Sequence, residues 1–145
     1  MASVAAICIS EVRGIQKHEI PEAYFRIDHG IDGDAHAGNW HRQISLLSVE
    51  SVEKLQEKLS FKLKNGDFAE NVLVEGLAVS SLPVGTKLRI GEAVCEVTQI
   101  GKECHANCAI RKAAGDCVMP REGVFVKVLA SGKVKKGDGI EVLEA

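Results

Sequence analysis

Three of the five cysteines in this chain gather in one short segment, and clustered thiols can act as nucleophiles or metal ligands. Within fourteen consecutive residues stand Cys104, Cys108 and Cys117. Lys102 and Arg111 are close to them in sequence, and nearby cations stabilise the reactive thiolate. If residues 104–114 are helical, Cys104 and Cys108 share one face. The pattern predicts reactive or metal-binding thiols, and the alternative is small buried hydrophobic residues.

A closed zinc site is a second alternative for the same thiols. Structural zinc sites combine two short Cys or His pairs about a dozen or more residues apart. Here one C-x3-C pair is followed by a single later cysteine, with His36 and His105 as candidate fourth ligands. This spacing disfavours a zinc finger, although thiolates suit a thiophilic metal in an open site. Cys8 and Cys95 lie outside the cluster and are predicted to be core residues.

A second polar group occupies a segment rich in Gly, Asp and His. It contains Asp32, Asp34, His36, His41 and Arg42. Such a set of carboxylates and imidazoles could bind a metal, shuttle protons or hydrogen-bond a polar ligand. The alternative is a solvated loop in which Asp caps turns and Gly adopts positive φ. A weaker candidate is Glu70-Asn71, which could contact a polar ligand or cap a strand.

These groups must be positioned by a chain that is rich in short strands. Apolar runs and alternating patterns predict strands over residues 3–10, 44–47, 71–74, 87–90, 93–99, 124–129, 133–135 and 140–142. Gly91-Glu92 suits the two-residue loop of a hairpin. Residues 20–43 lack periodicity, so an irregular loop is predicted there.

One amphipathic helix interrupts the strands. Ser48 is its predicted N-cap, and Asn65-Gly66 is its predicted end. Its apolar face consists of Val49, Val52, Leu55, Leu59 and Leu63. Many short strands with Gly turns and a single strong helix predict a fold that is mainly β with minor α (α+β), in a closed or nearly closed β-structure.

Length and composition predict one domain spanning residues 1–145. Eighteen Lys and Arg against twenty Asp and Glu give a net charge of −2, which argues against a nucleic-acid partner bound through bulk charge. The longest N-terminal apolar run, residues 4–9, is far shorter than the roughly 20 residues of a membrane span, so no membrane association is expected. An odd number of cysteines predicts reduced thiols in a cytoplasmic protein. Phosphate-binding, dinucleotide-binding, α/β-hydrolase and zincin motifs are missing.

Through most of its length the sequence resembles a stand-alone MOSC domain, the module named after the C-terminal part of molybdenum cofactor sulfurases. The resemblance rests on pieces that follow one another in the right order: residues 33–38 with 42–47, 66–71, 82–86 with 88–91, 98–105, 115–125 and 137–138. Each piece alone is weak, and their order makes the resemblance specific. The variant around Cys104 and Cys117 is similar to MOSC domains found beside or fused to molybdopterin-biosynthesis proteins.

The resemblance implies a β-barrel-like fold and a role in molybdenum cofactor metabolism. In the family a cysteine is thought to carry sulfur as a persulfide or to ligate molybdenum, and counting from Thr98 that cysteine falls on Cys104. Cys108 and Cys117 are then resolving or second carrier thiols. The phosphate and pterin of the cofactor (molybdopterin) are expected to meet basic residues, with further polar side chains in the same pocket. The expected contacts are Arg42, Lys102 and Arg111, together with Asp34, His36, Glu70 and Asn71.

The implied partners follow from what the chain lacks. It has no domain for a pyridoxal-phosphate desulfurase, so sulfur is expected from a cysteine desulfurase or another donor protein. The acceptor is expected to be a molybdopterin-biosynthesis protein or a molybdoenzyme. Two alternatives stay open: a small molybdenum-cofactor oxidoreductase that reduces N-hydroxylated compounds, and a non-enzymatic module that binds the cofactor.

Overall fold

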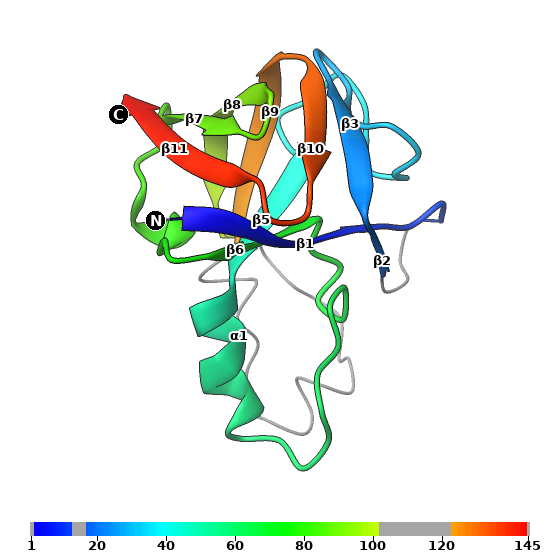
Figure 1. Ribbon diagram of the computed structural model, residues 1–145, viewed down its shortest axis with the longest axis vertical. Coiled ribbons are helices and arrows are strands. Elements are labelled where there is room, and N and C mark those ends of the chain that lie inside the picture. Colours follow the sequence, from blue (N-terminus) through cyan, green and yellow to red (C-terminus); the bar gives the residue numbers. More distant parts are fainter. Residues whose placement is uncertain (1, 13–16, 102–122, 145) are drawn as a thin grey trace.

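Seven strands close into a β-barrel in the computed structural model, which describes residues 2–12, 17–101 and 123–144 (Figure 1). The ring runs through β1 (Ala2–Ile9), β6 (Val72–Glu75), β5 (Ile44–Ser48), β9 (Val124–Ala130), β8 (Ala93–Ile100), β7 (Lys87–Ile90) and β11 (Gly139–Glu144). It is closed by the antiparallel pairing of β11 with β1, in which Ala2 faces Ile140. The predicted class, mainly β with minor α, is confirmed.

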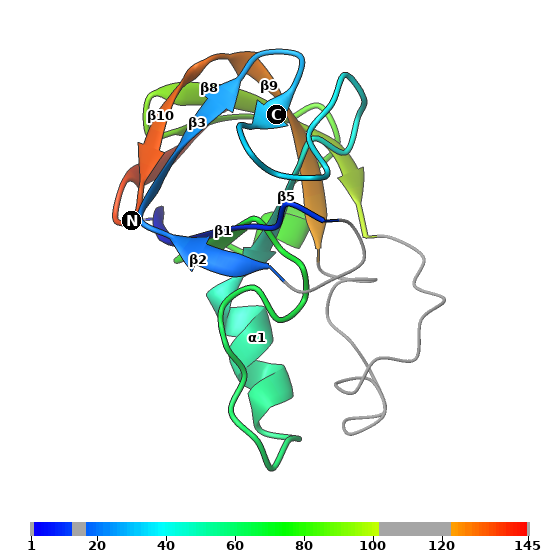
Figure 2. The ribbon, with the colours of Figure 1, turned by 90° about the vertical axis from the view of Figure 1, so that its right-hand side faces the viewer.

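A smaller sheet and one further strand complete the wall. β2 (His18–Ile20) pairs with the second half of β1. β10 (Gly132–Lys135), β3 (Glu22–Arg26) and β4 (Gly30–Ile31) form a three-stranded sheet. Figure 2 shows β3 and β10 arching from the side of β2 toward β8 and β9. The prediction of an irregular loop over residues 20–43 is therefore wrong where β3 and β4 lie, at residues 22–26 and 30–31. The signal was weak because Phe25 is the single buried residue of β3.

Apolar side chains pack on both faces of the barrel wall, and the alternation along the strands separates them. The inner cluster includes Ile44, Leu46, Val72, Leu88, Ile90, Val97, Val124 and Val126. The outer cluster contains Ala6, Leu47, Leu55, Phe68, Leu73 and Phe125. Strand β5 is buried along its whole length because it contributes to both. Cys8 and Cys95 are fully buried, which confirms that they are core residues.

The helix is shorter than predicted. α1 spans Val49–Gln56 and lies below the barrel in both views, against β5 and β6. It ends early because the Gln56 side chain accepts from Leu63 N (2.7 Å) and donates to Phe61 O (2.8 Å), which holds the chain in a loop. Leu59 and Leu63 still pack on the outer cluster. The apolar periodicity was thus correct for burial and wrong for conformation.

Ser48 stands at the N-cap position, but its hydroxyl does not cap the helix. It donates to Leu77 O (2.7 Å) and accepts from Val79 N (3.0 Å), so it ties the end of β5 to the 3-10 turn η1 (Val79–Ser81). The predicted hairpin is confirmed: β7 and β8 pair across Gly91-Glu92, and Gly91 has φ +56°. The left-handed φ explains why glycine stands first in that loop.

Candidate functional site

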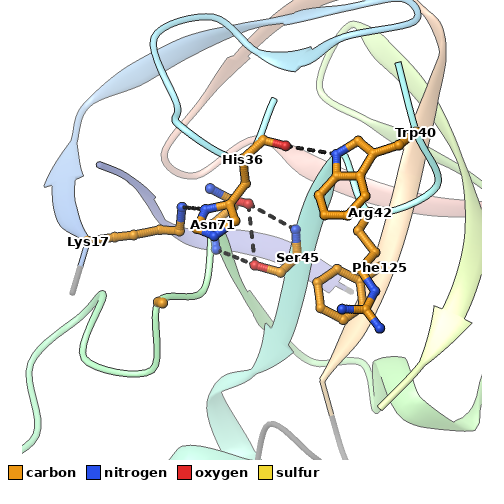
Figure 3. A pocket seen from close by; sticks show the side chains of 8 residues that line it. Lys17, His36, Trp40, Arg42, Ser45, Asn71 and Phe125 are labelled. Atoms are coloured by element: carbon orange, nitrogen blue, oxygen red, sulfur yellow. Dashed lines mark hydrogen bonds between the residues drawn. The ribbon is translucent and has the colours of Figure 1, made fainter. Parts of the chain in front are cut away.

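A pocket of about 110 Å³ lies on the outer side of the wall formed by β5 and β9 (Figure 3). Its lining comes from chain segments that are far apart in sequence: Lys17, His36, Trp40, Arg42, Ser45, Ala69, Asn71 and Phe125. Ser45 and Phe125 are register partners on β5 and β9. They alternate with Ile44, Leu46, Val124 and Val126 of the inner cluster, which places them on the opposite face.

Arg42 is held in a defined orientation at this pocket. Its Nε donates to Gln99 Oε1 at 3.0 Å, and its Cζ lies 5.3 Å from the centroid of the Phe125 ring. The same Gln99 oxygen lies 3.0 Å from His41 Nε2. Among the described residues only Nε of Arg42 is hydrogen-bonded, which leaves the terminal guanidinium nitrogens for a ligand. A planar guanidinium of this kind suits the paired oxygens of a carboxylate or phosphate.

The polar lining residues Asn71 and Ser45 use their hydrogen-bonding groups to hold neighbouring strands together. Asn71 is buried, and its Oδ1 accepts from Ser45 N (2.9 Å) while its Nδ2 donates to Cys8 O (3.0 Å). The Ser45 hydroxyl accepts from Asn71 N (2.9 Å). These bonds join β5 and β1 where β6 begins. Asn71 therefore shapes the pocket wall with its amide already satisfied by the protein.

Glu70, the neighbour of Asn71, does not line the pocket. Its carboxylate is 1% exposed and accepts from Gly66 N (2.8 Å) and Phe68 N (3.1 Å). Burial raises the pKa of this carboxyl, while the backbone hydrogen bonds act in the opposite direction. Its contacts are those of a residue that organises the turn before β6.

Asp34 lies behind the pocket wall. Its Oδ1 accepts from Ser10 N (3.1 Å) and from Lys17 Nζ (2.6 Å), and both side chains of this ion pair are buried. Lys17 Nζ also lies 3.0 Å from His36 Nδ1. The structure thus joins two predicted residues, Asp34 and His36, through a lysine that sequence reasoning missed. A lone lysine seventeen residues upstream carried no signal.

The other missed lining residues had a weak signal. Trp40 is the one tryptophan in the sequence and stands in the polar loop, where its indole N–H donates to His36 O at 2.9 Å. Phe125 is the last residue of the run 115–125, one of the pieces that carry the family resemblance. Since aromatics make up only 4% of the chain, one inside a Gly- and His-rich loop could have been selected as a candidate.

The predicted thiol cluster lies outside the described residues, as do its basic neighbours: Cys104, Cys108, Cys117, Lys102 and Arg111. The described residues on either side meet, because Gly101 N donates to Gly123 O at 2.6 Å. Gln99 precedes Gly101 by two residues, and Phe125 follows Gly123 by two residues. Both of them contact Arg42. One described flank of this segment thus contributes Phe125 to the pocket lining, and the other contributes Gln99, which holds Arg42 by a hydrogen bond.

The two described cysteines are poor nucleophiles. Burial raises the pKa of both Cys8 and Cys95 to about 12, so neither forms an appreciable thiolate near neutral pH. In the part of the chain that the structure describes, no group of three or more His, Cys, Asp or Glu side chains could hold a metal ion. Over the same residues, no helix is long and apolar enough to cross a membrane.

Comparison with known proteins identifies the class. The MOSC domain model matches residues 32–141, and this chain belongs to the MOSC domain family, which is associated with molybdenum-cofactor-related proteins. The uncharacterized protein YflK of Bacillus subtilis (strain 168) is 27% identical over 140 residues. That alignment covers 90% of this chain and 63% of YflK, so the chain spans less than two thirds of that relative.

Solved structures agree with the fold. The YuaD protein from Bacillus subtilis superposes with a TM-score of 0.81 at 21% identity, covering 100% of this chain and 97% of that one. YiiM from Geobacillus stearothermophilus superposes with a TM-score of 0.72 at 18% identity, and the match covers 99% of this chain and 76% of the YiiM chain. YiiM from Escherichia coli superposes with a TM-score of 0.70 at 18% identity, and the match covers 100% of this chain and 71% of that YiiM chain. At these identities the likeness establishes the barrel architecture.

Proposed function

We propose that this protein binds the molybdenum cofactor, or a precursor of it, and carries sulfur for it on Cys104. The observation that supports binding most directly is the orientation of Arg42, whose guanidinium is fixed at the pocket by Phe125 and Gln99. Membership of a family associated with molybdenum-cofactor-related proteins supports the choice of ligand. Cys104 is proposed from the sequence resemblance.

The described residues have donors and surfaces that fit such a ligand. Arg42 offers a fork for phosphate, and the rings of Trp40 and Phe125 offer apolar surface for a planar ring system. A volume of about 110 Å³ accommodates one end of the ligand, with the remainder outside the described pocket. When bound, the cofactor would supply a thiophilic metal centre that can accept sulfur.

The sulfur step needs no external oxidant or reductant. The Cys104 thiolate would attack the outer sulfur of a donor persulfide, the S–S bond of the donor would break, and the donor would leave as a thiolate. Lys102 and Arg111 are close in sequence and would favour the thiolate form of Cys104. Cys8 and Cys95 are poor alternatives because burial raises the pKa of each to about 12.

The sulfur-carrier half is tested by incubating anaerobically purified protein with a cysteine desulfurase and cysteine. Intact mass after alkylation should show a gain of about one sulfur per chain, removable by reductant. Peptide mapping should place it on Cys104, and Cys104→Ser should abolish it. Cys95→Ala serves as the control, since it removes a thiol from the core and should leave loading unchanged.

Loading that persists in Cys104→Ser would contradict the assignment of the carrier. Cys108→Ser and Cys117→Ser then decide which thiol accepts sulfur first. If the thiols are reactive but gain no sulfur, stoichiometric molybdenum in the purified protein would support the alternative of direct ligation by a cysteine.

The binding half is tested at Arg42. Arg42→Gln should weaken retention of cofactor released anaerobically from a molybdoenzyme by about tenfold or more, as expected for loss of a charged hydrogen bond. Arg89→Gln is the matched control because it removes the same charge from an exposed position on β7, where Arg89 lies 3.9 Å from Glu141. Equal retention by both variants would contradict a role for Arg42.

A further inference from the structure

The side chain of Lys17 places a buried ammonium at the pocket. It is 1% exposed, and its Nζ donates to Asp34 Oδ1 at 2.6 Å. The backbone of Lys17 is also fixed, because its N–H donates to Gly66 O at 3.0 Å. A charge removed from water in this way needs partners for all its donors.

The partners of Lys17 can be counted. An ammonium has three N–H bonds and no acceptor. Asp34 Oδ1 accepts from one of them. His36 Nδ1, at 3.0 Å from Nζ, accepts from a second, and Figure 3 shows this contact. Within the described part of the chain the third has no partner, and Lys17 is one of the residues that line the pocket. This donor is thus available to a molecule that enters the cavity.

The contact with His36 also fixes the state of that ring. Because Lys17 Nζ can only donate, His36 Nδ1 must accept, and the proton of the imidazole then resides on Nε2. Asp34 in turn is held by Ser10 N (3.1 Å), so the donor direction of Lys17 is set from behind the pocket wall.

We propose that Lys17 is an anion anchor of this pocket, that its third N–H binds an acceptor-only, negatively charged oxygen of the ligand, and that Asp34 is its positioning residue. Among the described lining residues the formal charges are the two cations Lys17 and Arg42, with no carboxylate. The ligand class is an oxyanion, either a phosphate or a metal-bound oxo group. The inference relies on the proposed function only for this choice of oxyanions.

The experiment compares the native protein with a paired variant, Lys17→Met with Asp34→Asn, which removes both members of the buried ion pair together. Inorganic phosphate and molybdate are titrated separately by calorimetry near neutral pH. The paired variant should bind the preferred oxyanion about tenfold or more weakly, because a charged hydrogen bond is lost. Preference for phosphate would indicate the phosphate end of a cofactor, and preference for molybdate would indicate an oxo group.

The chain offers a matched control. Lys133 and Glu22 form an ion pair at 2.9 Å between β10 and β3, with side chains 53% and 46% exposed. Lys133→Met with Glu22→Gln makes the same change in charge away from the pocket and should leave binding unchanged. Circular dichroism of both paired variants verifies that they fold.

The positioning role of Asp34 has its own readout. Asp34→Asn leaves Lys17 without its carboxylate, so a bound oxyanion becomes the counterion of the ammonium. Saturating phosphate should therefore raise the melting temperature of Asp34→Asn by more than it raises that of the native protein. An equal rise would overturn the positioning role, since a merely structural residue would not change the response to anion.

The two proposals can fail separately. Undiminished oxyanion binding by the paired Lys17 and Asp34 variant, or no binding by the native protein, overturns the anchor. Sulfur loading on Cys104 would leave the carrier proposal standing in that case. Loss of oxyanion binding in the paired variant, with no sulfur loading of the native protein, would support the anchor and contradict the carrier.

Discussion

Asp32 and Asp34 stand two residues apart, and each forms an ion pair in which the charged atoms are 2.6 Å apart. Asp32 pairs with Arg26 on the surface, where the two side chains are 39% and 54% exposed. Asp34 pairs with Lys17 inside, where both are at most 1% exposed. The two carboxylates thus form ion pairs of equal length in different surroundings. Water screens the attraction within the exposed Asp32–Arg26 pair. In the buried Asp34–Lys17 pair, only contacts with other protein groups offset the cost of removing the charges from water.

Among these charged residues, we expect the largest loss of stability on substitution of Lys17. Lys17→Met leaves the Asp34 carboxylate buried without its cation and should lower the free energy of unfolding by about 3–5 kcal/mol. Adding Asp34→Asn should recover most of this loss, because the uncompensated charge is then gone. Urea denaturation of the single and paired variants measures both. If the paired variant were as unstable as the single one, packing rather than charge would govern the site.

Unlike Asp32 and Asp34, the buried carboxylate of Glu70 has no cation beside it among the described contacts. Glu70→Gln removes one of two acceptors for Gly66 and Phe68 and should destabilise the fold by about 1–3 kcal/mol. Because burial raises the folded-state pKa of Glu70, the folded protein binds this proton more tightly than the unfolded chain. The resulting stability is present at low pH and is lost as pH rises through the folded-state pKa.

The measurement for Glu70 is urea denaturation across roughly pH 4 to 8, the range around and above the ordinary pKa of a glutamate. The native protein should lose stability with rising pH relative to Glu70→Gln, whose side chain does not titrate. Parallel pH profiles for the two proteins would show that Glu70 does not titrate differently in the folded state.

The smallest effect is expected at Asp32. The Arg26 hydrogen bond lowers the pKa of Asp32, so its contribution is present above the unfolded-state pKa and is lost as pH falls through the folded-state value. Asp32→Asn should shift the denaturation midpoint only slightly at low salt and not measurably at about 1 M salt, where exposed charges are screened. A loss as large as that of Lys17→Met would show that exposure does not decide the strength of these pairs.

Much of the fold could be predicted from the sequence because strand patterning is local. The alternation in β8, with Ala93, Cys95 and Val97 buried, and the glycine at Gly91 both identify the hairpin. The end of α1 could not be predicted, since it depends on how the Gln56 carboxamide bonds to a loop five to seven residues away. Strand β3 was missed because only Phe25 marks it as buried.

The candidate site was predicted only where its residues are close in sequence. Asp34, His36 and Arg42 stand on one loop, so their grouping was visible. Lys17 joins them through the path of the chain across β2, β3 and β4, which no local pattern encodes. The patterns also could not separate Asp32 from Asp34, because burial depends on the strands around them.

The closure of the barrel between β1 and β11 has a consequence for how the chain acquires its structure. Ala2 and Ser3 find their partners only at Ile140 and Gly139, after nearly all of the sequence between them has been made. On a ribosome, the start of β1 therefore keeps one edge unpaired until β11 emerges, although the second half of the same edge can already pair with β2. Contacts between such distant residues also slow folding in general. We expect ring closure to be a late event, and the unpaired β1 edge to be the place where a chaperone or a second nascent chain would bind first.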